Sequence, residues 1–203
     1  MRLVMSDGHP FVSTWSNWPV AQDVASNGRN LKRGAFSRAP SSAIGTSIVM
    51  KPTSVEKMGA RSFIDTNILI YAEASDVPAK QRAALALLKQ LFEGASGVLS
   101  TQVLQEYCNV ALKKLKLSVQ HVRAQLDMYE QFEVIQVTPA IIRVGLDLHQ
   151  TRSLSFHDAI VVASAQTAGC GFLFTEDMST GETVGTVRIL NPFAPGSSTR
   201  LQK

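Results

Sequence analysis

Short apolar runs alternate with longer amphipathic stretches from residue 61 to about residue 193. Apolar runs of four or five residues are typical of buried strands, whereas apolar residues at every third or fourth position are typical of helices with one buried face. Strands are predicted at SFID, GVLS, EVIQV, GFLF and VRIL, which occupy residues 62–65, 97–100, 133–137, 171–174 and 187–190. Strands that alternate with helices form a parallel sheet with helices on both faces. The pattern therefore predicts an α/β fold.

The predicted helices begin and end at residues that commonly bound helices. Gly94 follows one of them, and Thr138-Pro139 supplies another with a capping hydroxyl and a first-turn proline. The predicted helices occupy residues 66–71, 79–93, 101–115, 119–132, 139–151 and 155–168. In such folds, ligands bind beyond the carboxyl ends of the strands, so candidate functional residues are sought there.

Residues 1–60 follow neither pattern and are interrupted throughout by proline, glycine and serine. This composition predicts a disordered or weakly ordered basic leader. Two explanations stay open: an organelle transit peptide, or translation that truly begins nearer Met50 or Met58, which we favour. The chain is thus divided into a leader (1–60), one folded domain (61–193) and a short flexible tail (194–203).

The net charge of +4 would suggest nucleic-acid binding, but the leader alone carries it. Residues 1–60 hold seven Lys and Arg against three Asp and Glu, and the remaining residues hold thirteen of each sign. The charge therefore says little about what the folded domain binds.

Cysteine content and hydropathy narrow the class of protein. The two cysteines, Cys108 and Cys170, lie in apolar patterns, which favours free thiols in a reducing, cytoplasmic environment. No run of 18 or more apolar residues is present, which excludes a membrane-spanning helix.

Acidic residues lie near the ends of the predicted strands. Asp65 comes directly after an apolar pair in the first strand, and Asp177 follows the fourth strand. Glu106 lies about a turn and a half into the helix that leaves the second strand. Asp158 reaches the same edge of the sheet if its helix begins there. The four carboxylates therefore form one candidate site.

Each acid also has an ordinary structural explanation. Asp65 could cap the short helix that it precedes. Asp158 fits a capping box with Ser155 as the cap, and Asp177 could be a turn residue in a polar loop. Glu106 is too deep in its helix to cap it, so only a solvated helix face would explain it. The functional interpretation therefore depends on the four acids occurring together.

Converging carboxylates require a particular chemistry. They repel one another and raise one another's pKa values unless a cation lies between them. Oxygen ligands without His or Cys favour hard cations, Mg²⁺ or Mn²⁺. Such ions lower the pKa of bound water and stabilise the charge that develops on a phosphodiester under attack. His157 is next to Asp158, so on a helix its side chain would point elsewhere, and we interpret it as a packing or surface residue.

Five segments together make the sequence similar to a known family. They are SFIDTNILIY (62–71), LSTQVLQEY (99–107), SFHDAIVVASA (155–165), LFTEDM (173–178) and RILNPF (188–193). In this order they resemble the PIN-domain family, and within it the VapC-type toxins of bacterial toxin–antitoxin pairs. The resemblance covers about residues 61–193. Such proteins usually begin within a few residues of the first acidic motif, whereas some 60 residues precede it here.

The resemblance implies a three-layer α/β/α sandwich around a five-stranded parallel sheet, and an endoribonuclease that depends on Mg²⁺ or Mn²⁺. All four acids match the family's acidic quartet. Asp65 and Asp158 would be the principal metal ligands, and Glu106 and Asp177 would complete the site directly or through water.

The resemblance also implies supporting residues and partners. Asn67 and Thr175 match polar positions that hold the carboxylates. The substrate would be RNA, a small cognate antitoxin would cover the site, and the chain would form a homodimer. The candidates for an apolar partner face are Leu85, Leu88, Leu91 and Phe92, for which core packing is the simpler explanation.

Basic side chains near the site could contact RNA phosphates. Lys113, Lys114 and Lys116 lie at the end of the helix that carries Glu106, where cations also complement the helix dipole. Arg152 comes just before the segment SFHD, which puts it nearer to the proposed edge.

Two other functions compete with this interpretation. A phosphoacceptor receiver domain needs an acidic pair after its first strand and a lysine after its last, and the chain has neither. A PIN scaffold without catalysis, acting as an RNA- or protein-binding module, would be recognised by the loss of an acid, and none is lost here.

Because residues 1–57 contribute no predicted strand or helix, we expect a chain that starts at Met58 to unfold cooperatively and to cleave RNA like the full chain. Thermal unfolding followed by circular dichroism, together with a cleavage assay, would test this. Loss of cooperative unfolding in the shortened chain would show that residues 1–57 are structural.

Overall fold

The computed structural model describes residues 60–194, so the predicted leader and tail fall almost entirely outside the described part. Within it, a six-stranded sheet has the order β3-β2-β1-β4-β6-β5. The strands are β1 (Ser62–Ile64), β2 (Gly97–Ser100), β3 (Glu133–Ile135), β4 (Phe172–Phe174), β5 (Thr183–Val184) and β6 (Val187–Leu190). The five strands that the sequence predicts are parallel to one another.

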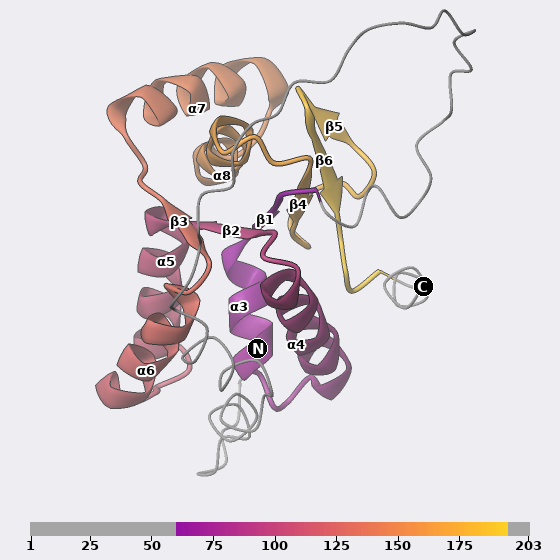
Figure 1. Ribbon diagram of the computed structural model, residues 1–203. Coiled ribbons are helices and arrows are strands. Elements are labelled where there is room, and N and C mark those ends of the chain that lie inside the picture. Colours follow the sequence, from indigo (N-terminus) through magenta and orange to yellow (C-terminus); the bar gives the residue numbers. More distant parts are fainter. Residues whose placement is uncertain (1–59, 195–203) are drawn as a thin grey trace, which may run out of the picture. The chain divides into compact units, whose positions relative to one another are not determined.

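Helices cover both faces of this sheet, as Figure 1 shows. On one face, α7 (Pro139–Arg152) packs on α8 (Phe156–Thr167), which in turn contacts β2, β4 and β6. The helices of the other face are α3 (Thr66–Glu73), α4 (Pro78–Glu93), α5 (Thr101–Lys113) and α6 (Val119–Tyr129). The predicted α/β/α sandwich is confirmed.

The sixth strand, β5, is absent from the sequence prediction, which had five. It pairs antiparallel with β6, with Val184 opposite Val187. Gly185 lies between the two strands at φ +60°, a left-handed conformation that tight hairpin turns favour. Since β5 has only two residues, it leaves no alternation of apolar and polar positions from which it could be predicted.

The third strand is shorter than its predicted range of 133–137. It ends at Ile135, and the Val137 backbone N–H then donates to Thr101 Oγ1 at 3.1 Å. The chain therefore leaves the sheet toward α5 two residues before the apolar pattern ends.

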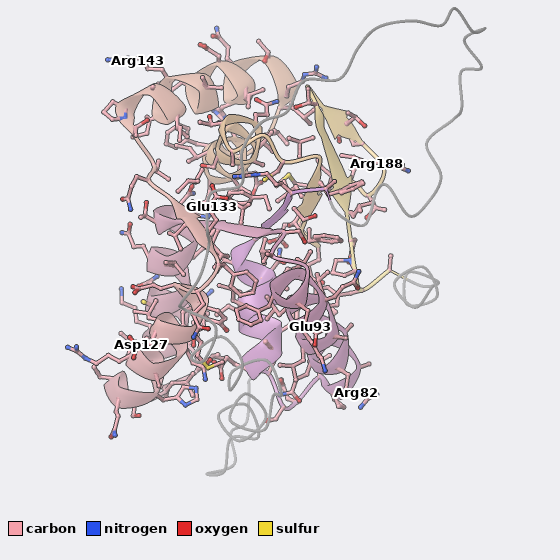
Figure 2. The ribbon with its side chains drawn as sticks, viewed as in Figure 1. Arg82, Glu93, Asp127, Glu133, Arg143 and Arg188 are labelled. Carbon is pink, nitrogen blue, oxygen red and sulfur yellow. The ribbon has the colours of Figure 1, made fainter. Side chains whose placement is uncertain are left out.

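The hydrophobic core includes the central strand β1 and the helix α8, which packs on the sheet. Phe63 and Ile64 of β1 have no exposed surface, and α8 buries every residue from Ala159 to Ala165. A parallel strand covered on both faces has no polar side, which explains why the predicted strands are continuous apolar runs. In contrast, the charged side chains labelled in Figure 2 on α4, α6 and α7 are exposed.

The apolar residues of α4 that could form a partner face contribute to this core instead. Leu88 and Leu91 are buried, and Leu85 and Phe92 are half-buried. The Phe92 ring lies 5.7 Å from that of Phe132, edge to face. Core packing is therefore their observed role.

The free cysteines and the helices of the described residues bear on two further predictions. Cys108 and Cys170 are both free thiols, as expected. Among the helices of residues 60–194, none has the length and apolar character that a membrane crossing requires.

The strand order places β1 between β2 and β4, and this determines where the site lies. The chain runs from β1 outward to β2 and β3, then returns to the other side of β1 as β4. The carboxyl ends of β1 and β4 therefore meet at the point where the strand order reverses, which is where ligands bind in such sheets. The Asp65 N–H donates to the Phe174 carbonyl at 3.1 Å, so the residues that follow these two strands are adjacent.

Gly97, at the start of β2, packs closely against the Phe132 ring. A Cβ at this position would lie 2.6 and 2.7 Å from two carbons of the buried Phe132 ring. We expect Gly97→Ala to lower the free energy of unfolding by about 1–3 kcal/mol, measured in urea, because the ring must shift to make room. Gly171→Ala is the control, since its nearest neighbouring atom would be 3.7 Å away. Equal stability of the two variants would contradict this account.

Candidate active site at the carboxyl edge of the sheet

Asp65, the first candidate ligand, lies directly after β1 and is only 5% exposed. Its Oδ1 accepts from the Thr66 backbone N–H at 2.7 Å, which caps α3. Its Oδ2 accepts from Thr175 Oγ1 at 2.7 Å and from Asn67 Nδ2 at 3.1 Å. Asp65 can therefore cap α3 and also belong to the acidic site, because Oδ1 caps the helix and Oδ2 accepts the hydrogen bonds from Thr175 and Asn67.

Asn67 and Thr175 lie between two of the acids, as their proposed supporting role requires. Asn67 Nδ2 is 2.9 Å from Thr175 Oγ1 and 3.0 Å from Asp177 Oδ2. Thr175 Oγ1 also accepts from the Asp177 backbone N–H at 3.1 Å. Asn67 Oδ1 is buried and has no hydrogen-bond partner among residues 60–194. The structure therefore links Asp65 to Asp177 through Asn67, which donates to both carboxylates, and through Thr175, which donates to Asp65 and accepts from the Asp177 N–H.

Glu106, on α5, is connected to the same site by Thr66. Thr66 Oγ1 donates to Glu106 Oε2 at 2.8 Å. The same oxygen lies 2.5 Å from His157 Nε2, and His157 Nδ1 lies 3.0 Å from the side-chain nitrogen of Gln102. The side chain of Glu106 is about one-third exposed, so its contacts leave it open to solvent.

The contact of His157 with Glu106 was missed from the sequence. His157 is exposed, as expected of a surface residue, and its side chain, which was expected to point elsewhere than Asp158, contacts Glu106. Adjacent residues on a helix diverge by about 100°, and here α5 lies on the side to which His157 points. Only the packing of α8 beside the start of α5 could reveal this.

Asp158 has the contacts of a capping box. Its backbone N–H donates to Ser155 Oγ at 3.1 Å, and Ser155 Oγ donates to its Oδ2 at 2.7 Å. No hydrogen bond joins it to the other three acids among the described residues. Consistently, no group of three or more His, Cys, Asp or Glu side chains within residues 60–194 is arranged so that it could hold a metal ion.

Burial raises the pKa of Asp65. Its pKa rises from its ordinary value of 3.8 to about 6, mainly because burial penalises the carboxylate. The hydrogen bonds from Thr175 and the Thr66 N–H lower the pKa, whereas the negative charges of Asp177 and Glu106 raise it further. Burial and the neighbouring acids therefore raise the pKa of Asp65 by more than its hydrogen bonds lower it.

The basic candidates lie outside this cluster. Lys113 and Lys114 are exposed at the end of α5, and Arg152 is exposed at the end of α7. Lys113 is seven residues beyond Glu106, about 10 Å along the helix at 1.5 Å per residue. No ion pair joins any of the three to another of the described residues, so all three cations are available to a ligand.

A second polar network fixes the loop that carries Thr175 and Asp177. Glu176, between them, accepts from Tyr71 OH and pairs with Lys80 Nζ at 2.5 Å. Lys80 Nζ lies 4.2 Å from the centroid of the Tyr71 ring, and the Tyr71 ring packs edge-on against Phe193 at 4.9 Å. The loop is thus held from both sides, and no sequence motif indicated this network.

These features place the chain among the α/β proteins that carry acidic side chains where the order of a parallel sheet reverses. The family model described as PIN domain matches residues 62–179, and the chain belongs to this family, as its motifs predict. No curated protein matches the chain.

Several solved structures are similar to the chain. A toxin–antitoxin complex from Klebsiella pneumoniae is 25% identical, with a TM-score of 0.47 over 64% of this chain and 97% of that one. VapC20 of Mycobacterium tuberculosis, titled a sarcin–ricin loop cleaving toxin, is 19% identical, with a TM-score of 0.45 over 55% and 86%. DNA-bound VapBC from Salmonella typhimurium is 16% identical, with a TM-score of 0.49 over 66% and 98%.

The raised pKa of Asp65 predicts a dependence of stability on pH in the metal-free chain. Because this pKa is higher in the folded state than in the unfolded state, Asp65 contributes most below pH 4, and its contribution is lost as the pH rises through about 6. We expect the stability of the wild type relative to Asp65→Asn to fall by about 2 kcal/mol between pH 4 and pH 7. Urea unfolding in EDTA at several pH values measures this difference, and a difference that is constant with pH would contradict it.

Proposed function

We propose that the chain is a metal-dependent endoribonuclease that uses Asp65, Glu106, Asp158 and Asp177 to hydrolyse RNA phosphodiester bonds. The observation that carries the proposal is the buried carboxylate of Asp65, which has the acids Asp177 and Glu106 near it and lies where β1 and β4 end. Membership of the PIN domain family and the complete set of four acids support it.

The residues present fit a divalent cation in three respects. Their side-chain donors are carboxylate and amide oxygens, which Mg²⁺ and Mn²⁺ prefer. The raised pKa of Asp65 reflects a charge that a cation would stabilise. Asn67 Oδ1 is buried without a partner among the described residues, which leaves an acceptor beside Asp65 and Asp177 for an ion or its water. A bound ion would lower the pKa of a water molecule and stabilise charge on the phosphodiester.

Each side chain has a distinct part in this proposal. Asp65 and Asp158 are the principal ligands, and Asp158 must exchange its contact with Ser155 for the ion. Glu106 and Asp177 complete the site directly or through water.

Three neutral side chains orient these carboxylates. Asn67 and Thr175 hold Asp65 and Asp177 apart at fixed positions, and Thr66 does the same for Glu106. Loss of such partners usually weakens metal binding about 10–100-fold.

The biological setting of the proposal comes from the resemblance to VapC-type toxins. We propose that the chain acts in the cytoplasm as the toxin of a toxin–antitoxin pair, that a cognate antitoxin covers the acidic edge, and that the toxin is a homodimer. Exposed Lys113, Lys114 and Arg152 are the proposed contacts to RNA phosphates.

A PIN scaffold without catalysis is the alternative, favoured by one observation. The acidic side chains of residues 60–194 do not form a group arranged to hold a metal ion. If this arrangement persisted in solution with Mg²⁺ or Mn²⁺, the chain would bind RNA or protein without cleaving it. Titration calorimetry with each metal distinguishes the two functions independently of activity.

The main experiment compares RNA cleavage by the wild type, Asp65→Ala and Asp158→Ala in Mg²⁺, in Mn²⁺ and in excess EDTA. We expect each variant to lose activity by more than about 100-fold, because it removes a metal ligand rather than a supporting residue. Asp127→Ala is the matched control, since Asp127 is an exposed acid on α6 (Figure 2).

Two results would contradict the proposal. One is equal cleavage by the folded variants and the wild type. The other is full activity in excess EDTA, which would show that the reaction needs no metal. If the wild type binds Mn²⁺ but cleaves no RNA offered to it, the substrate class is wrong and the metal site stands.

A further inference from the structure

A groove of about 650 Å³ continues from the acidic edge along α5. The side chains that line it are Gln102, Gln105, Glu106, Asn109 and His157. Four of these five lie on α5 at spacings of three or four residues, which places them on one face of the helix. Glu106 belongs both to the groove and to the acidic site, so whatever fills the groove lies next to the reacting phosphodiester.

The chemistry of the lining does not suit a phosphate. Among the described residues, neither lysine nor arginine lines the groove, and Glu106 would repel an anion. Three of the lining residues are primary amides, which offer a donor and an acceptor in one plane. This is the pattern that pairs with the edge of a nucleobase, and an imidazole ring such as that of His157 can stack on a base.

Two of the amides are available to a ligand. Gln102 is occupied, because its side-chain nitrogen lies 3.0 Å from His157 Nδ1. Gln105 and Asn109 are exposed, and their side chains make no hydrogen bond to another residue of the described range. They are four residues apart, so their side chains are neighbours on the helix surface.

We propose that this groove binds one unpaired nucleobase of the RNA next to the scissile bond, and that Gln105 and Asn109 select which base it accepts. The inference rests on the proposed ribonuclease function and deepens it, since it assigns a preference for base identity to two residues outside the acidic quartet. Unpaired bases are the usual targets of sequence-specific recognition in RNA, because their edges are accessible.

A variant of Lys113 distinguishes recognition of a base from electrostatic attraction to the RNA phosphates. It is four residues beyond Asn109 on the same face of α5, and it is exposed. A phosphate contact there strengthens binding to all sequences equally, whereas an amide contact to a base edge favours one base.

The experiment determines the bases on both sides of the cut by sequencing the products of a single-stranded RNA pool with random sequence. We expect the wild type to show a bias at one position next to the cut. In Gln105→Ala/Asn109→Ala, that bias should fall by about tenfold, while its cleavage still requires the metal. Two controls should keep the bias: Lys113→Ala, with uniformly weaker and less salt-dependent cleavage, and Gln120→Ala, which removes an exposed amide from α6.

An unchanged bias in the double variant, or an absence of bias in the wild type, would overturn the proposal. Either result would favour a protein, rather than a nucleobase, as the ligand of Gln105 and Asn109. Loss of the bias in Lys113→Ala alone would likewise overturn it, because charge and not base contact would then set the preference.

A binding measurement keeps this inference separate from the proposed function. Fluorescence anisotropy with ten-nucleotide oligo(A), oligo(C) and oligo(U) is measured for the wild type in EDTA, and for the double variant. If the wild type cleaves nothing but prefers one oligonucleotide, and the double variant loses that preference, the ribonuclease proposal fails and the base-binding groove stands. Equal affinity of the wild type for all three oligonucleotides would count against the groove.

Discussion

A buried carboxylate at the end of the central strand is the constraint on which the rest of the carboxyl edge depends. Burying a charged group is unfavourable unless hydrogen bonds compensate, and Asp65 receives them from the start of α3 and from Thr175 after β4. These donors belong to segments far apart in sequence, so β1 and β4 must pair in the observed register for Asp65 to be satisfied. Burial still raises the pKa of Asp65 to about 6, above its ordinary value, despite these hydrogen bonds.

The loop after β4 is held from two sides, and this determines where Asp177 lies. Thr175 faces the site and bonds to Asp65, while Glu176 turns the other way to Lys80 and Tyr71. Consecutive residues thus point in opposite directions, one into the site and one into a structural network that includes an aromatic contact with Phe193. A loop fixed in this way keeps Asp177 near Asn67 without a strand or helix of its own.

The two acids on helices are placed by different kinds of contact. Asp158 is held locally by Ser155, three residues before it, whereas Glu106 is held by side chains from α3 and α8. Local contacts such as the capping box can be predicted from a short sequence pattern. The contact between Glu106 and His157 could not be, because it depends on how α5 and α8 approach one another. That same approach forms the wall of the groove in which Gln105 and Asn109 are exposed.

The sequence by itself determined the five parallel strands, the helices between them and the edge of the sheet near which Asp65, Glu106 and Asp177 lie, whereas the fourth candidate, Asp158, contacts Ser155. These features follow from apolar periodicity, capping residues and the direction of parallel strands, all of which act over a few residues or apply to every fold of this class. Only the tertiary structure decided that Thr175 bonds to Asp65 across 110 residues, that Lys80 pairs with Glu176 across 96, and that His157 reaches Glu106 across 51. Such contacts leave no local pattern, because they form only when the packed core has already set the distance between the elements that carry them.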